Sequence, residues 1–118
     1  MKIDSTPVVT RAFLKAVEFL EMPRSDAALI LGISEASLSR LFQGERVIES
    51  PTKEGEIAII FLRLYRSLDT LFGGDRRNSV KWFKSPNTHL GGVPIELVKS
   101  IEGLVEVTEY LAAMRGKV

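Results

Sequence analysis

The stretch KWFKSPNTHLGGVPIELV, residues 81–98, decides how the C-terminal half of this chain is arranged. A helical pattern runs up to the aromatic pair Trp82-Phe83, and the Ser-Pro-Asn sequence at 85–87 ends the helix. The Gly-Gly pair at 91–92 permits positive φ angles, while Pro94 fixes φ and suits the first turn of a helix. The stretch therefore predicts a helix end, a tight irregular connection and a new short helix that runs to Lys99.

Apolar residues recur at three- and four-residue steps on both sides of this stretch, which is the period of an amphipathic helix. Ser34 and Asp75 are the side chains expected to cap helices, and the Ser25-Asp26 pair offers another cap. The longest helix is expected from about Lys53 to Phe72, with Ile57, Ile60, Phe61, Leu64, Leu68 and Leu71 on one face. A final helix is expected from Ser100 to Gly116, with apolar positions at Ile101, Leu104, Val105, Val107, Leu111 and Met114. No segment shows sustained period-two alternation, so the predicted fold class is all-α.

Composition excludes several functional classes. The chain has 118 residues, 45% hydrophobic and 26% charged, which are ordinary globular values. It contains no cysteine and one histidine, His89, so we expect no disulfide, no metal centre and no cofactor. The start of the chain does not resemble a secretory signal, and the longest apolar run, 57–62, is far shorter than the ~20 residues of a membrane helix. The sequence thus predicts a soluble cytoplasmic protein without a membrane partner.

The two parts of the chain carry different charge. Residues 1–50 hold six basic and seven acidic side chains, whereas the remainder holds ten basic and eight acidic ones. Neutralisation of phosphates supplies most of the non-specific affinity for DNA. A slightly acidic first part therefore argues against tight DNA binding by a single copy.

Residues 24–43 fit the steric pattern of a helix-turn-helix. Ala28 is small where two helices would come closest, and Gly32 supplies the turn. Ile33, Leu38 and Leu41 would then pack the second helix onto the rest of the bundle. The segment resembles helix-turn-helix modules of the Xre and phage-repressor kind, although a short helical hairpin with no nucleic-acid role would show the same pattern.

If this segment reads DNA, its second helix enters the major groove with its N-terminal residues at the base edges. Arg40 could bind a guanine and Gln43 an adenine, while serines could contact phosphate. The candidate DNA-binding residues are Ser34, Ser37, Ser39, Arg40, Gln43 and Arg46. Arg40 is the one basic residue on the second helix, so DNA binding should need two or more copies acting together.

The C-terminal half resembles the toxin-binding domain of Xre/MbcA/ParS-type antitoxins over about residues 55–118. The resemblance lies in Trp82, Pro86, Asn87, Leu90, Gly92, Pro94, Glu96 and Leu97, and in Arg115-Gly116 near the end. It implies a helix-turn-helix domain over 1–52 followed by a small helical toxin-binding domain over 53–118. Members of this family neutralise RES-domain toxins, small enzymes that consume NAD⁺, by placing their C-terminal end over the substrate pocket. The resemblance thus implies a type II antitoxin that represses its own operon through operator DNA.

The tail of the chain is the expected contact with the toxin. Arg115 and Lys117 can pair with the groups that line a dinucleotide pocket, and arginine suits bidentate pairing with a carboxylate. The candidate toxin-binding residues are Trp82, Asn87, Met114, Arg115, Gly116, Lys117 and Val118. For Trp82 a place in the core is the alternative, and for the tail it is a solvated chain end. Asn87 is expected to bond its own backbone and fix the corner.

Two other functions remain as alternatives. The chain could be a stand-alone transcriptional regulator whose C-terminal half only dimerises. An enzyme is disfavoured because the sequence has no cysteine, no Ser-His-Asp arrangement and no glycine-rich phosphate loop after a strand, and we assign no catalytic residue. A homodimer is expected in both non-enzymatic cases because helix-turn-helix proteins bind paired half-sites, and the long helix from Lys53 to Phe72 is the expected contact.

Overall fold

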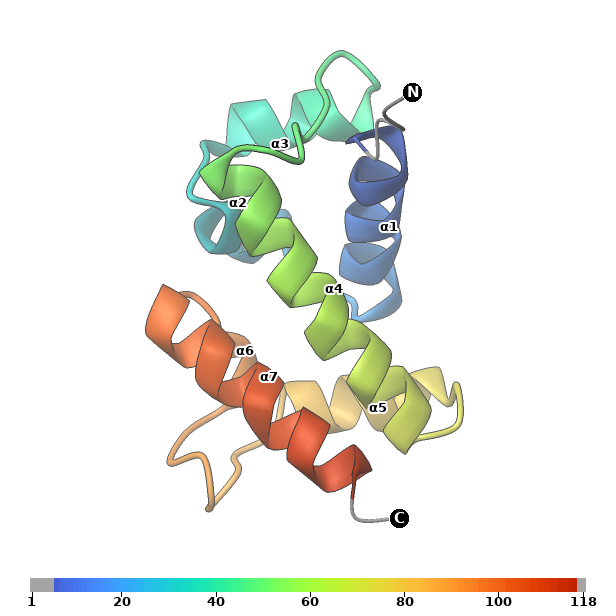
Figure 1. Ribbon diagram of the computed structural model, residues 1–118, viewed down its shortest axis with the longest axis vertical. Coiled ribbons are helices and arrows are strands. Elements are labelled where there is room, and N and C mark those ends of the chain that lie inside the picture. The colour runs from blue at the N-terminus through green and yellow to red at the C-terminus, as the bar shows by residue number, and fades with distance from the viewer. Residues whose placement is uncertain (1–5, 117–118) are drawn as a thin grey trace.

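The computed structural model describes residues 6–116, and this part of the chain folds into seven helices without a strand (Figure 1). The helices are α1 (Thr6–Phe19), α2 (Arg24–Leu31), α3 (Glu35–Phe42), α4 (Lys53–Leu71), α5 (Arg76–Phe83), α6 (Pro94–Leu97) and α7 (Ile101–Arg115). The prediction of an all-α fold is confirmed.

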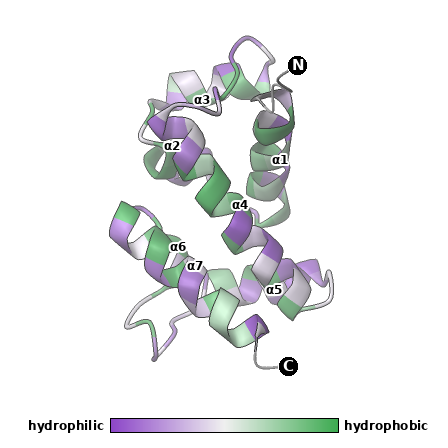
Figure 2. Cartoon of the chain, viewed as in Figure 1, coloured by the Kyte–Doolittle hydropathy of each residue, from purple (hydrophilic) through white to green (hydrophobic). Residues whose placement is uncertain are grey.

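Helix α4 is the centre of the molecule. Its 19 residues pack against α1 and α2 at one end and against α5 and α7 at the other, as Figure 1 shows. Of the predicted apolar face, Phe61, Leu64 and Leu68 are fully buried, whereas Ile57, Ile60 and Leu71 are half-buried. Apolar residues also concentrate in α1 and in the adjoining part of α4 (Figure 2). One core therefore runs along α4 and takes side chains from both halves of the chain.

Three phenylalanines join the halves through α4. The Phe61 ring meets the Phe13 ring of α1 at 5.4 Å between centroids and the Phe83 ring of α5 at 6.4 Å, both edge to face. All three side chains are 0% exposed. Edge-to-face pairs stabilise beyond the area that they bury.

The caps predicted at Ser34 and Asp75 are confirmed, and Thr52 and Ser100 cap α4 and α7 in the same way. The side chains of Ser34, Asp75 and Ser100 each accept a hydrogen bond from a backbone N–H three residues later. The cap predicted at Ser25-Asp26 is wrong: α2 begins at Arg24, after Pro23, and no side chain caps it. Proline at the preceding position already sets an extended entry into the helix, with φ −58° and ψ 143°.

Basic side chains of α5 cover the C-terminal end of α1. The Arg76 guanidinium donates to the carbonyls of Phe19 and Glu18 at 3.0 and 3.2 Å, and the Lys84 ammonium donates to the carbonyl of Glu21. The last carbonyls of a helix lack intrahelical partners and attract cations. The start of α5 is exposed, and Arg76 also joins the two halves of the chain.

A second polar contact joins α2 to the segment before α7. The Lys99 ammonium lies 3.1 Å from Asp26 and 2.8 Å from Glu96. Its pKa is raised, chiefly by the hydrogen bond to Glu96 and then by the one to Asp26. Asp26, expected as a helix cap, instead anchors α2 to the C-terminal half.

Two glycines allow backbone segments to touch helices. A Cβ on Gly103 of α7 would lie 1.9 Å from the carbonyl oxygen of Leu97, and one on Gly55 of α4 would lie 2.3 Å from that of Glu49. Both distances are far inside van der Waals contact. The angle between α6 and α7, and the path of the chain into α4, therefore require these glycines.

Candidate functional site

Helices α2 and α3 form a compact two-helix unit joined by residues 32–34. Gly32 adopts φ 72° and ψ 32°, the left-handed conformation expected of a turn glycine. Ala28 is 2% exposed, and Leu38 and Leu41 of α3 are 0% and 2% exposed. The steric roles predicted for these residues are therefore confirmed, whereas a role in DNA binding stays a prediction.

The candidate DNA-binding side chains lie just before α3, on it and just after it, and three of them, Ser34, Ser37 and Arg40, form hydrogen bonds with one another. Ser34 caps the helix by accepting from the Ser37 N–H at 3.0 Å. The Arg40 guanidinium donates to the Ser37 hydroxyl at 3.2 Å. Arg40 and Gln43 are exposed, whereas Ser37 and Ser39 are half-buried. Ser34 is exposed as well, and contact of any of these side chains with DNA stays a prediction.

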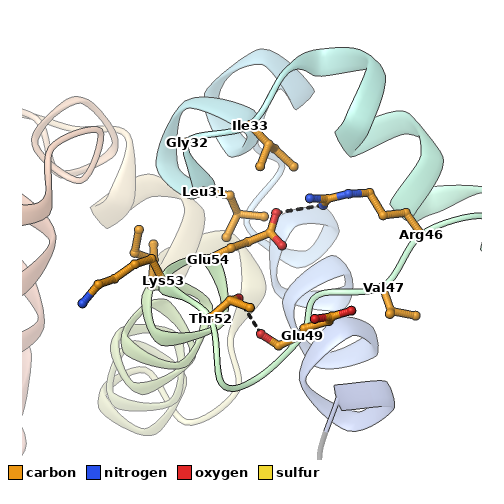
Figure 3. A pocket seen from close by; sticks show the side chains of 10 residues that line it. Leu31, Gly32, Ile33, Arg46, Val47, Glu49, Thr52, Lys53 and Glu54 are labelled. Atoms are coloured by element: carbon orange, nitrogen blue, oxygen red, sulfur yellow. Dashed lines mark hydrogen bonds and ion pairs between the residues drawn. The ribbon is translucent and has the colours of Figure 1, made fainter.

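Arg46, the last of the candidate DNA-binding residues, forms an ion pair with Glu54. It lies 2.8 Å from Glu54 in the first turn of α4, across a cavity of about 570 Å³ between the α2–α3 turn, the connection to α4 and the start of α4 (Figure 3). The connection itself is tied to α1, because the Ile48 N–H donates to the Thr10 hydroxyl at 2.9 Å. Arg46 therefore positions the connection, and its charge is compensated in the free protein.

The connection between α5 and α6 is a closed turn built around Asn87. The Asn87 side-chain oxygen accepts from the Leu90 N–H at 3.0 Å, and its backbone N–H donates to the Gly92 carbonyl at 2.9 Å. Gly91 within the turn has φ 75°. The predicted corner is confirmed, and it makes Asn87 a residue that shapes the turn; its contact with a toxin stays a prediction.

Trp82 is half-buried and belongs to a stack of three rings. Its ring stacks on Tyr110 of α7 at 6.4 Å between centroids and 16° between planes, and His89 stacks near the same tyrosine at 6.2 Å. Trp82 also packs against the hydrophobic core. The stack fixes the turn and α5 onto α7, a role of Tyr110 and His89 that sequence periodicity did not reveal.

The end of α7 projects into solvent. Ala112, Ala113, Met114, Arg115 and Gly116 are all exposed. Lys117 and Val118, the other two candidates in the tail, lie outside the described residues. Three apolar side chains of α7, those of Ile101, Val105 and Met114, are 64%, 36% and 37% exposed. Only one stripe of α7 is buried. It consists of Gly103, Leu104, Val107, Thr108 and Leu111.

Within residues 6–116 no three acidic, histidine or cysteine side chains gather as metal ligands would. None of the helices in that range combines the length and the apolar character that crossing a membrane requires.

Comparison with known proteins gives one match. No curated protein matched the chain. Residues 67–117 match the family model described as the antitoxin Xre/MbcA/ParS C-terminal toxin-binding domain. The matched segment starts in the last part of α4 and takes in α5, the Asn87 turn, α6 and α7. This match supports an antitoxin of the Xre/MbcA/ParS family whose C-terminal part is its toxin-binding domain.

Proposed function

We propose that this protein is a type II antitoxin that binds a RES-domain, NAD⁺-consuming toxin and occludes its active site with the C-terminal end of α7. The match of residues 67–117 to a toxin-binding domain carries the proposal. The exposed last turn of α7 supports it, because that turn is free to enter a cavity of a partner. The protein acts in the cytoplasm, where NAD⁺ is consumed, and needs no cofactor of its own.

The tail can be tested by deletion. Removing residues 115–118 is expected to leave the fold intact and to weaken protection against the toxin, because the deletion takes away two cations, Arg115 and Lys117, that can pair with groups in a nucleotide pocket. Growth and NAD⁺ content are measured in cells that co-express the toxin with the full or shortened chain. The double variant Arg11→Gln, Arg77→Gln removes two exposed cations elsewhere and should protect like the full chain. Equal protection by the shortened chain removes the tail from the mechanism.

The same protein is proposed to repress its operon as a homodimer through α3. The exposed side chains of Arg40 and Gln43 support this role, since arginine and glutamine read guanine and adenine edges in the major groove. Two copies on paired half-sites would supply the cations that a single α3 lacks.

Substituting Arg40 tests the DNA-binding role. Arg40→Ala is expected to weaken binding to the operon's promoter by about 1–3 kcal/mol and to relax specificity at one base pair. Fluorescence anisotropy with promoter DNA measures this, and the log–log salt slope of the unchanged protein should be about −0.9 per neutralised phosphate. Arg77→Gln, on the exposed side of α5, is the control. Absence of promoter binding both with and without the toxin contradicts the role.

A stand-alone regulator is the alternative. It predicts promoter binding that no RES-domain protein modifies and no protection against such a toxin. The co-expression experiment above separates the two functions directly.

A further inference from the structure

Three arginines surround one cavity beside the C-terminal end of α7. Arg63 and Arg66 come from α4 and Arg115 from the last turn of α7, and they line a cavity of about 230 Å³ together with Ser67, Thr108 and Ala112. Helices α4 and α7 pack side by side along this stretch (Figure 1). We call this cavity and the three arginines the arginine groove.

The three arginines bring positive charge to the groove. None of its three arginines forms an ion pair with a residue of the described range, although Arg46 and Lys99 elsewhere are paired with carboxylates. Like charges that share one cavity repel one another, and an anionic group placed between them relieves that repulsion. Ser67, which is 3% exposed, lines the same cavity.

Apolar surface continues the groove along α4. One adjoining cavity is lined by Arg63, Ile60 and Val105 together with Thr108 and the carboxylate of Glu109. Another is lined by both α4 arginines together with Val8 and Ile59. Val8, Ile59 and Val105 are 57%, 39% and 36% exposed. Arginine among apolar side chains is the composition of protein interfaces, where charged residues of other types are depleted. The whole strip from α1 across α4 to α7 thus has the chemistry of a docking surface.

We propose that the arginine groove is a second part of the toxin-binding surface and that it receives carboxylates of the toxin. The inference rests on the proposed function and extends it, because Arg63 and Arg66 precede the segment that matches the toxin-binding domain. Arg115 belongs to both the groove and the tail, so a toxin that holds the tail also lies over the groove. Planar guanidinium groups pair with carboxylates through two parallel hydrogen bonds.

Two other occupants fit the observations less well. A second copy related by a two-fold axis through the groove would bring arginines against arginines, so a dimer contact on this side of α4 is disfavoured by charge. Helix α3, where DNA is proposed to bind, lies at the other end of the molecule from the C-terminal end of α7, as Figure 1 shows. An acidic surface of the toxin remains the occupant that both charge and position favour.

The test is the affinity of the full chain for its RES-domain toxin, purified as a catalytically inactive variant and measured by calorimetry. The double variant Arg63→Gln, Arg66→Gln should bind about tenfold to a hundredfold more weakly, and its affinity should depend less on salt. Both side chains are exposed, so thermal melting should be unchanged. The matched control is Arg11→Gln, Arg77→Gln, which loses the same charge from exposed positions that line none of these cavities and should bind like the original chain.

Each result has one meaning. If the original chain does not bind the toxin, the proposed function fails and this inference fails with it. If the original chain binds and the groove variant binds equally well, only the inference is overturned. A groove variant that keeps toxin affinity but loses promoter binding or self-association overturns it in favour of phosphate or of a second copy.

Discussion

Gly103→Ala is expected to destabilise the protein by about 3 kcal/mol or more, although alanine is the better helix former by about 1 kcal/mol. The reason is the contact between the helix and the backbone before it. A Cβ at this position would lie 1.9 Å from the Leu97 carbonyl oxygen, and neither backbone can move without changing the angle between α6 and α7. Urea denaturation followed by circular dichroism measures the loss.

The control is Gly116, the residue that follows the last residue of the same helix. A Cβ on Gly116 would lie 3.5 Å from its nearest neighbour, the Ala112 carbonyl oxygen, an ordinary van der Waals distance. Gly116→Ala should therefore be neutral or slightly stabilising. If Gly103→Ala also stabilises, in line with helix propensity alone, the close packing of α7 on Leu97 is contradicted.

Phe61→Ala is expected to cost about 3–5 kcal/mol and to lower the stability of both halves together. The Phe61 ring is fully buried between Phe13 in the first part of the chain and Phe83 in the second, so its removal opens a cavity at their junction. Trp82 is the one tryptophan of the chain, and its fluorescence reports on the second part. Circular dichroism reports on all helices, so the two signals should give coincident urea transitions.

The comparison for this prediction is Ile59→Ala on the same helix. Ile59 is 39% exposed, and its truncation should cost less than about 1 kcal/mol. Two separated transitions, with tryptophan fluorescence changing at a different urea concentration from circular dichroism, would show that the halves unfold independently.

Local structure was largely predictable from the sequence. The helix interiors follow from the three- and four-residue apolar period, and the helix starts at Ser34 and Asp75 follow from side chains that can cap a free N–H. The turn around Asn87 also followed, because proline, asparagine and glycine each restrict or permit particular backbone angles. Such features depend on neighbours within a few residues.

The arrangement of the candidate sites was less predictable. The residues of the tail and of α3 could be named, but the pairing of Arg46 with Glu54 and the stack of Trp82 on Tyr110 join positions that no local pattern relates. The exposure of Val105 could not be predicted for the same reason. The sequence alone cannot show whether an apolar residue on a helix is buried or exposed, because this depends on how the neighbouring helix packs against it.

The amino-acid sequence by itself determined that the chain is helical, where most helices begin and end, and that its second half carries the signature of a toxin-binding domain. Only the tertiary structure decided that α4 joins both halves in one core and that Arg63 and Arg66 lie in one cavity with Arg115. Backbone propensity acts over a few residues, whereas these contacts depend on the packing angle of α7 against α4. The direction of α7 relative to α6 also requires a Cβ-free position at Gly103, beside the Leu97 carbonyl, and no periodicity marks that position.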